Sequence, residues 1–202
     1  MGLYHSAHKF GGPKGVGLLY ARRGLPLVNL IYGGAQERGT RGGTDNLPGI
    51  CGAAAAFREA LDSMEETGPQ IQTLRDRLIE GLCAIPHTAL NGEQQRRLPG
   101  NVNLCFEGIE GEALLLLLNE AGIFASSGSA CTSASLDPSH VLLALGRPHE
   151  VAHGSLRLSL NAQNTNQEVD YILQKLPEIV AYLRSISPVW DELERGERAH
   201  LL

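Results

Sequence analysis

The sequence predicts an α/β fold. Short apolar segments of strand length alternate with longer segments in which apolar residues recur every three or four positions, and Gly or Pro separates the two kinds. The chain has 202 residues, of which 43% are hydrophobic and 19% charged, so it has enough apolar side chains to form a core. The net charge is -5 and the arginines are scattered, so we expect no surface for nucleic acid or anionic lipid.

The first part of the chain is predicted to consist of strands and loops. Residues 1–15 are rich in turn formers and lack the strand and helix pairs that normally precede such a loop. Residues 16–21 and 27–32 are short apolar runs bounded by Gly or Pro, which predicts two buried strands. Five of the eleven residues from 33 to 43 are glycines, and such a loop lets the backbone approach a ligand closely.

Two helices are expected next. Residues 48–64 contain good helix formers, and a second helix is predicted after Pro69, where apolar residues form one stripe. We therefore place a domain boundary at Thr67. Residues 1–66 form a strand and loop segment, and residues 67–202 form a compact α/β module.

Strands and helices alternate in the second domain. Strands are predicted at residues 102–106, 123–125 and 156–160, and a helix is predicted at residues 110–121, closed by Gly122.

A final helix is predicted to begin at a capping box, in which Thr165 is followed three residues later by Glu168. Pro177 is expected to kink this helix or end it early. The chain after Trp190 is polar and is expected to be mobile.

No segment resembles a signal peptide, and the longest apolar run, residues 113–118, is too short to span a bilayer, so we expect a cytoplasmic protein. The four cysteines are far apart, and no carboxylate or cysteine partner stands at ligand spacing from the scattered histidines His140, His149 and His153. We therefore expect neither a disulfide framework nor a metal site. Cys51, Cys83 and Cys105 lie within helix or strand patterns and are interpreted as core residues.

Lys9 follows His8 in a glycine-rich stretch that runs from Ser6 to Gly15. A Schiff-base lysine needs such surroundings, because its amine must be partly desolvated and flanked by donors before it can attack an aldehyde. On spacing alone, a glycine-rich turn with surface lysines is the commoner explanation. The order of Gly, Lys and Ser/Thr excludes a Walker A loop.

Cys131 stands in a run of ten small residues, 126–135. Such a run does not pack a core, so the cysteine is expected on an exposed, mobile loop where its thiol can act as a nucleophile. An incidental cysteine in a flexible loop explains these residues equally well.

Arg157 alternates with Leu156 and Leu158 in a predicted strand. One face of the strand then belongs to the core, and the other presents a guanidinium whose planar fork suits a substrate carboxylate. An arginine that faces water on an edge strand is the commoner case.

Taken together, four strings resemble the C-terminal half of the NifS/IscS-type cysteine desulfurases, in the class V aminotransferase family. They are Ser6-Ala7-His8-Lys9 with Gly12-Pro13-Lys14-Gly15, the loop of residues 33–44, Ser127-Gly128-Ser129-Ala130-Cys131, and Leu156-Arg157-Leu158-Ser159-Leu160. The resemblance implies a fold-type I PLP-dependent transferase. Residues 1–66 would be the C-terminal remnant of the large PLP-binding domain, and residues 67–202 the small C-terminal α/β domain with the active-cysteine loop.

The resemblance also implies how the cofactor is held. Lys9 would hold pyridoxal 5'-phosphate and act as acid and base in the reaction. Ser6 and His8 would contact the phosphate of the cofactor. Thr44 would reach the phosphate in the neighbouring subunit, so the functional unit would be a homodimer.

For the substrate, the resemblance implies that Arg157 binds the carboxylate of L-cysteine. Cys131 would attack the substrate sulfur, release L-alanine and retain a persulfide for a sulfur-acceptor or iron-sulfur scaffold protein. The cofactor would supply the electron sink while the protein orients the reacting bond.

Two departures from the family pattern accompany this match. Asn161 stands where the family has Gly after the substrate-arginine strand. Family members also carry a long N-terminal portion before the cofactor lysine, so this chain is expected to be a fragment that lacks that half. The alternatives are a non-catalytic dimerisation or scaffold-docking module and a selenocysteine lyase. The long loop of small residues around Cys131 favours the NifS/IscS type.

Overall fold

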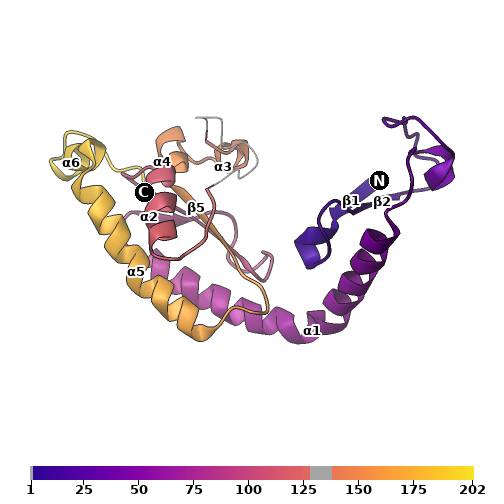
Figure 1. The fold of residues 1–202 in the computed structure, drawn as a ribbon. Coiled ribbons are helices and arrows are strands. Elements are labelled where there is room, and N and C mark those ends of the chain that lie inside the picture. Colours follow the sequence, from indigo (N-terminus) through magenta and orange to yellow (C-terminus); the bar gives the residue numbers. More distant parts are fainter. Residues whose placement is uncertain (1, 128–137) are drawn as a thin grey trace. The chain divides into compact units, whose positions relative to one another are not determined.

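The computed structural model describes residues 2–127 and 138–202. The chain divides into two compact units, Met1–Glu66 and Thr67–Leu202 (Figure 1). They are called the first unit and the second unit below, and each is described by itself.

A hairpin opens the first unit. Strand β1 (Gly2–Ser6) pairs antiparallel with β2 (Gly17–Ala21), and Ser6 lies opposite Gly17. A Cβ atom on Gly17 would lie 2.8 Å from the carbonyl oxygen of His5, so the hairpin leaves no room for a side chain there. The strand at residues 2–6 was not predicted, whereas β2 confirms the strand expected at residues 16–21.

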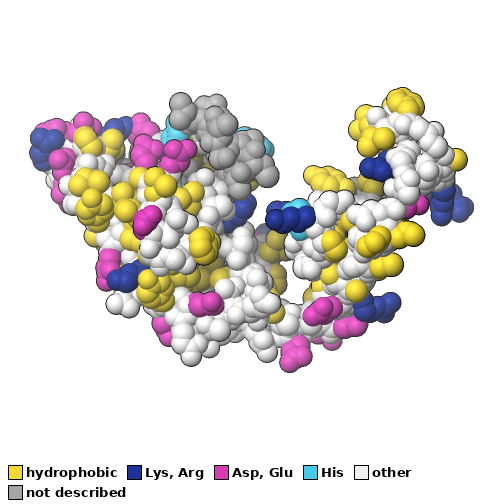
Figure 2. Space-filling view, viewed as in Figure 1, with side chains coloured by type: hydrophobic (Ala, Val, Ile, Leu, Met, Phe, Trp, Pro, Cys, Tyr) yellow, Lys and Arg dark blue, Asp and Glu magenta, His cyan; other side chains and the backbone are white. Residues whose placement is uncertain are grey.

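Apolar side chains of the first unit are mostly exposed. Among residues 2–66, Ala7 and Ala53 are the buried apolar residues. Side chains coloured as hydrophobic are visible over this unit in Figure 2. The large exposed ones are Leu3, Tyr4, Leu18, Leu19, Tyr20, Leu25, Leu27, Val28, Leu30, Ile31, Tyr32, Leu47, Ile50, Phe57, Leu61 and Met64. The predicted strand at residues 27–32 is wrong, because this segment has no strand partner and its side chains are largely exposed.

Helix α1 (Leu47–Cys83) is a single helix of 37 residues, where two helices were expected. Asn46 caps its start, since the Asn46 Oδ1 atom accepts a hydrogen bond from the Gly49 amide. Pro69 lies inside the helix and removes one backbone donor, which costs about 3 kcal/mol in a helix interior. The next turns bury Leu78 and Leu82 completely, and this packing favours continuation of the helix.

The second unit is built on a three-stranded antiparallel sheet. Its order is β3 (Thr88–Leu90), β4 (Asn101–Phe106) and β5 (Ser155–Ser159). The strands expected at residues 102–106 and 156–160 are thus confirmed. The strand expected at residues 123–125 is wrong, because only an isolated bridge between Ser126 and Arg157 forms there.

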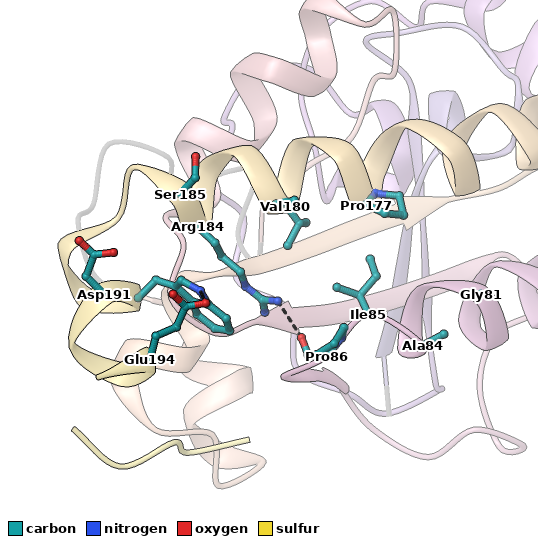
Figure 3. A pocket seen from close by; sticks show the side chains of 12 residues that line it. Gly81, Ala84, Ile85, Pro86, Pro177, Val180, Arg184, Ser185, Asp191 and Glu194 are labelled. Atoms are coloured by element: carbon teal, nitrogen blue, oxygen red, sulfur yellow. Dashed lines mark hydrogen bonds between the residues drawn. The ribbon is translucent and has the colours of Figure 1, made fainter. Parts of the chain in front are cut away.

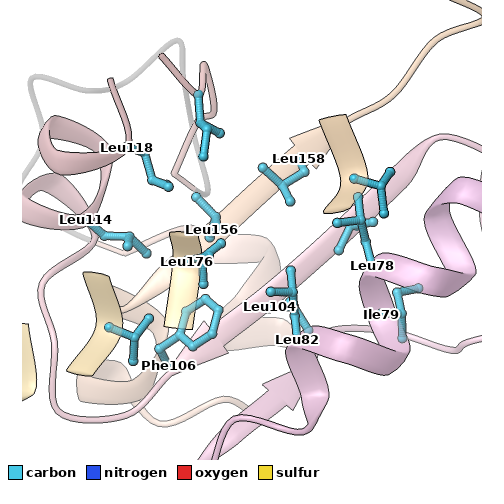
Figure 4. Packing of buried hydrophobic residues seen from close by; sticks show 14 of the residues in the cluster. Leu78, Ile79, Leu82, Leu104, Phe106, Leu114, Leu118, Leu156, Leu158 and Leu176 are labelled. Atoms are coloured by element: carbon cyan, nitrogen blue, oxygen red, sulfur yellow. The ribbon is translucent and has the colours of Figure 1, made fainter. Parts of the chain in front are cut away.

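One face of this sheet carries the main core. The second half of α1 packs there with α2 (Gly111–Glu120) and α5 (Asn166–Ser185), and the side chains interdigitate as Figure 4 shows. The members buried to 2% exposure or less are Leu78, Ile79, Leu82, Val102, Leu104, Phe106, Leu114, Leu118, Leu156, Val169, Leu176 and Val180. The core explains the alternation along β4 and β5, because every second residue must face the helices.

The opposite face of the sheet is partly polar. Cys105 is fully buried there and packs with Leu142, Val151 and Ala152. Leu142 belongs to α3 (His140–Ala144), and Val151 and Ala152 belong to α4 (His149–His153). Cys51 and Cys83 are exposed, so the prediction that all three helix or strand cysteines are core residues holds for Cys105 alone.

The C-terminal part is more ordered than the sequence predicted. The capping box of Thr165 and Glu168 starts α5 as expected, but Pro177 does not end the helix, which continues to Ser185. A further helix, α6 (Pro188–Glu194), follows, and Leu201 then hydrogen-bonds to Glu107. Among the described residues, none of the helices combines the length and the apolar character that a bilayer-spanning segment needs.

Candidate functional site

Lys9 lies in a tight turn that follows β1. Ala7 starts the 3-10 helix η1 (Ala7–Phe10) and is anchored by hydrogen bonds of its amide to the Val16 carbonyl and of its carbonyl to the Gly12 amide. A Cβ atom on Gly12 would lie 2.9 Å from the Ala7 Cβ, so glycine is required at this close approach. Ala7 is buried, and the neighbouring His8 and Lys9 are exposed.

The turn offers three polar groups without internal partners. The side chains of Ser6, His8 and Lys9 make no hydrogen bond or ion pair with the residues that the structure describes. An amine, a hydroxyl and an imidazole within four residues form a donor set suited to a small molecule that carries an aldehyde and a phosphate. The residues present therefore fit pyridoxal phosphate.

Thr44 lies in the glycine-rich loop before α1. The loop is held closed where the Gly42 amide donates to the Ile31 carbonyl, and a Cβ atom on Gly42 would lie 2.7 Å from the Gly33 Cα. Thr44 follows Gly43, whose φ of 102° is in the region that favours glycine. The Thr44 side chain is exposed, so its hydroxyl is accessible to a ligand.

Arg157 lies on the partly polar face of the sheet, in β5. Its amide donates to the Ser126 carbonyl at 2.6 Å, the Ser126 amide donates to the Arg157 carbonyl at 3.1 Å, and Asn103 lies opposite it on β4. The Arg157 Nε atom is buried and has no hydrogen-bond partner among the described residues. Such a guanidinium is held in place by its strand and retains capacity to bind an anion.

Cys131 lies outside the described residues. The structure describes the chain before it as far as Ser127, and Ser126 is the residue bridged to Arg157. Of the sequence-predicted residues, the structure thus brings together Ser6, His8 and Lys9 in one turn of the first unit, with Thr44 in a loop of the same unit. Arg157 belongs to the second unit.

The buried cysteine is a poor nucleophile. Burial raises the pKa of the Cys105 thiol, although a hydrogen bond from the Asn91 amide at 3.1 Å opposes this effect. Cys83 is exposed as a residue, but the neighbouring side chains partly desolvate its thiol and raise the pKa of that group. Both thiols therefore remain protonated near neutral pH and do not offer the thiolate that attacks a sulfur or binds a metal.

A row of polar residues beside Arg157 was missed by the sequence analysis. Asn91 Nδ2 donates to Asn103 Oδ1 at 2.7 Å, and Arg147 Nε donates to Asn91 Oδ1 at 2.8 Å. A signal was present in the sequence, because Asn101 and Asn103 alternate with buried residues in β4. The contact with Arg147 needed the fold, since this residue is 56 positions from Asn91.

A second missed cluster holds the C-terminal residues. Glu107 is buried and accepts hydrogen bonds from the Leu201 amide at 2.5 Å and from His200 Nδ1 at 2.9 Å. His87 lies 3.4 Å from the same carboxylate, and its ring stacks on that of His200 at 3.8 Å. The three side chains have ligand types that bind metals. Because Glu107 accepts hydrogen bonds from two residues of the C-terminal segment, His200 and Leu201, we interpret the cluster as a clasp for that segment.

A cavity of about 620 Å³ lies beside this clasp, between the end of α1, α5 and α6 (Figure 3). Arg184 crosses it, donates to the Pro86 carbonyl at 2.8 Å and places its guanidinium 4.0 Å from the centre of the Trp190 ring. Burial lowers the pKa of this guanidinium. None of the predicted site residues that the structure describes lines the cavity, and the guanidinium of Arg184 is already bound to carbonyl groups and to the Trp190 ring.

Comparisons with known proteins bear on this arrangement. The family model described as Aminotransferase class-V matches residues 2–172. A protein named cysteine desulfurase IscS from Clostridium botulinum is 56% identical over 195 residues, which are 95% of this chain and 49% of that protein. The cysteine desulfurase NifS of Azotobacter vinelandii is 50% identical over 185 residues, with coverage of 91% and 46%.

Solved structures show the same likeness. A structure titled NifS-like protein matches with a TM-score of 0.80 and 40% identity, and covers 90% of this chain and 47% of that chain. A NifS-like protein from Rickettsia africae matches with a TM-score of 0.79 and 27% identity, with coverage of 89% and 47%.

The chain spans about half the length of the curated relatives it matches. Members of this family use pyridoxal phosphate, and their fold is the fold-type I α/β architecture, of which the structure contains a part. The match covers strands, helices and loops of both units, from Gly2 to Ile172. The chain belongs to the aminotransferase class-V family.

Proposed function

We propose that this chain is the part of a cysteine desulfurase that carries the cofactor lysine, the substrate arginine and the sulfur-accepting cysteine. The observation that carries the proposal is the pair of backbone hydrogen bonds between Ser126 and Arg157. Ser126 precedes Cys131 by five residues, so the segment that leads to the thiol starts beside the arginine. The relatives named cysteine desulfurase support the reaction.

In this proposal the turn after β1 holds the cofactor. Lys9 attaches pyridoxal 5'-phosphate through its amine, and the Ser6 hydroxyl and the His8 imidazole donate hydrogen bonds to the phosphate. The cofactor supplies an electron sink that weakens the bonds at the substrate Cα atom. The free donors of this turn support the assignment.

Thr44 is assigned to the phosphate bound by a second copy of the chain. Its exposed hydroxyl follows a loop whose glycines allow a close approach, which supports contact with a ligand outside its own turn. The functional unit is then a homodimer, because each site needs a residue from the other copy.

Three residues of this chain have separate roles in the proposed reaction. Arg157 binds the carboxylate of L-cysteine and orients its carbon-sulfur bond, and Lys9 moves protons at the substrate. The Cys131 thiolate attacks the substrate sulfur, and the electron pair of the carbon-sulfur bond returns to carbon. The carbon takes a proton, L-alanine leaves, and the sulfur remains on Cys131 as a persulfide.

The proposal extends to domains, partners and location. Residues 1–66 are the remnant of a large PLP-binding domain, and residues 67–202 are the small C-terminal domain with the active-cysteine loop. The persulfide passes to a sulfur-acceptor or iron-sulfur scaffold protein in the cytoplasm. The relatives named IscS and NifS support this assignment through their names.

A non-catalytic docking or dimerisation module is the second candidate. One observation favours it: the main core lies wholly within the second unit, whereas Lys9 belongs to the first unit, which buries little apolar surface. The core of the second unit therefore does not depend on a working cofactor site, as a docking module requires.

A visible absorption spectrum distinguishes the two candidates. We would incubate the purified chain with pyridoxal phosphate, add L-cysteine, and repeat both steps with Lys9→Ala and with Lys14→Ala. A desulfurase site gives a cofactor band that Lys9→Ala abolishes, Lys14→Ala leaves intact and L-cysteine shifts. Lys14 is a matched control, because it is an exposed lysine five residues further along the same glycine-rich stretch.

A band that survives Lys9→Ala would refute the assignment of the cofactor lysine. No band in the unmodified chain would favour the docking module. Sulfide release measured with Cys131→Ser would then test the sulfur-accepting cysteine.

A further inference from the structure

We propose that Asn103 is a second donor to the substrate carboxylate beside Arg157, and that Arg147 orients the Asn103 amide through Asn91. The identity of the ligand as the carboxylate of L-cysteine rests on the proposed function. The new content is the donor pair and the relay that sets its direction.

The residues concerned form one row across the sheet. Asn103 lies opposite Arg157 in the register of β4 and β5, and the Asn91 amide donates to the Asn103 carbonyl at 2.9 Å on the other side. Ser126 extends the row beyond Arg157. In an antiparallel pair, opposite side chains on one face have Cβ atoms about 5 Å apart, so Asn103 and Arg157 are direct neighbours.

Arg147 determines which way the two amide groups point, because its guanidinium can only donate hydrogen bonds. Its Nε atom donates to Asn91 Oδ1 at 2.8 Å, and its Nη2 atom is held by the Leu90 carbonyl at 2.6 Å. The Asn91 Oδ1 atom must therefore face Arg147, and Asn91 Nδ2 faces Asn103. Asn103 must in turn present Oδ1 to Asn91.

This orientation leaves the Asn103 Nδ2 group as the available end of the amide. Among the described residues it has no hydrogen-bond partner, and neither does the buried Arg157 Nε atom on the neighbouring strand. Asn103 is half-buried and its Nδ2 group is not enclosed, so this donor is accessible to a ligand. Two adjacent donors match the two oxygens of one carboxylate.

The charge of the row agrees with an anionic ligand. The row and its relay contain two arginines, Arg147 and Arg157, and no acidic side chain. Arg147 is held by Leu90 and Asn91, which leaves Arg157 as the cation available to the ligand. Asn103 is therefore assigned direct contact with the substrate, whereas Asn91 and Arg147 are positioning residues.

The test is a nuclear magnetic resonance titration of the 15N-labelled, 202-residue chain. L-cysteine under reducing conditions is the probe, and cysteamine, which has the thiol and amine but no carboxylate, is the control ligand. The side-chain signals of Asn103 and Arg157 should shift together with L-cysteine and not with cysteamine. A shift of Arg157 alone would overturn the assignment of Asn103, and so would no shift of either residue.

Two variants of Asn103 and one control variant test the donor. Asn103→Ala should weaken L-cysteine binding about tenfold, and Asn103→Asp more, because a carboxylate then faces the ligand carboxylate. Asn101→Ala is the matched control: it changes an asparagine on the same face of β4, two residues along and opposite Ser159, and should leave binding unchanged. If Asn103→Ala and Asn101→Ala bind equally well, the proposal is wrong.

Asn91→Asp tests the relay without removing volume. The new carboxylate still accepts from Arg147 but has no donor for Asn103, so the Asn103 amide turns and presents its oxygen to the ligand. We expect about tenfold weaker binding, with no further loss when Asn91→Asp is combined with Asn103→Ala. Independent losses that add in the double variant would refute the relay.

These experiments distinguish failure of the Asn103 assignment from failure of the proposed desulfurase function. A Lys9-dependent cofactor band together with an indifferent Asn103 overturns the donor pair and leaves the desulfurase. Linked shifts of Asn103 and Arg157 without a cofactor band leave a carboxylate-binding site and overturn the desulfurase.

Discussion

The two units of the chain bury their apolar side chains to very different degrees. In the second unit, Leu78, Leu104 and Phe106 are fully buried between a sheet and three helices. In the first unit, Tyr4 is 83% exposed and Leu30 is 90% exposed, and the sheet formed by its described residues is a two-stranded hairpin. A hairpin alone is marginally stable in water. The comparison teaches that the second unit has a core of its own, whereas the candidate site residues of the first unit lie in a part of the chain with little core.

The largest expected effect comes from the core of the second unit. Leu104→Ala removes a fully buried side chain from the middle of β4, and such changes lower the free energy of unfolding by about 2–5 kcal/mol. Urea unfolding followed by the fluorescence of Trp190, the one tryptophan in the sequence, measures this directly in the second unit.

Leu19→Ala is the matched change in the first unit. Leu19 is 58% exposed in β2, and its loss should change the Trp190-monitored free energy by less than about 1 kcal/mol. Equal losses for Leu19→Ala and Leu104→Ala would contradict the contrast between the two units.

A smaller effect is expected from the clasp at Glu107. Glu107→Gln removes the charge from a buried carboxylate that accepts from Leu201 and His200, and hydrogen bonds to a charged group contribute about 1.5–3 kcal/mol. The Trp190 fluorescence transition should move to lower urea, and trypsin should cleave faster after Arg198.

Glu120→Gln is the control for the clasp, because Glu120 is exposed at the end of α2. It should leave both readouts unchanged. Unchanged proteolysis after Arg198 in Glu107→Gln would show that the carboxylate does not retain the C-terminal segment.

Secondary structure was predictable where burial determines the local pattern. The strands at Asn101–Phe106 and Ser155–Ser159 and the helix at Gly111–Glu120 face one core, so their apolar period is visible in the sequence. The segment at residues 27–32 has the composition of a strand but no partner, and composition does not report partners. Pro69 suggested a helix end, but the packing of the following turns outweighs its cost.

The candidate site was predictable only in part. The neighbouring glycines singled out Lys9, and the alternation with leucines in a predicted strand singled out Arg157. The family resemblance then implied a role for each. The Asn91-Asn103 contact and its link to Arg147 depend on strand register and on a residue beyond α3, which no local pattern specifies. The tail after Trp190 was expected to be mobile because it is polar. Its contact with Glu107, which lies 94 residues from Leu201, is not visible in a local pattern.

Gly68→Ala tests whether α1 is continuous at the boundary between the units, and its expected effect is smaller than those above. A Cβ atom at Gly68 meets nothing within 4 Å, and replacing glycine by alanine inside a helix stabilises it by about 0.5–1 kcal/mol. Thermal unfolding followed by circular dichroism should show a higher midpoint. At Gly81 the Cβ would lie 2.5 Å from Leu173, so Gly81→Ala in the same helix should give no such gain. A lower midpoint for Gly68→Ala would contradict a continuous helix at this residue.

The smallest effect concerns how the two long helices begin, and it separates them by pH. Helix α5 starts with a capping box in which the Thr165 amide donates to the Glu168 carboxylate, and this hydrogen bond lowers the pKa of Glu168 below its usual 4.5. A carboxyl with a depressed folded-state pKa contributes stability that is present above the unfolded pKa and is lost as the pH falls through the folded pKa. Helix α1 starts with Asn46, which does not titrate.

Glu168→Gln should therefore make the stability of the second unit fall less steeply as the pH drops below about 4.5, measured by urea unfolding followed by Trp190 fluorescence. Asn46→Ser keeps a neutral cap on α1 and should leave this pH dependence of stability unchanged. If Glu168→Gln and the unmodified chain lose the same stability below about pH 4.5, the capping box is not the source of that loss.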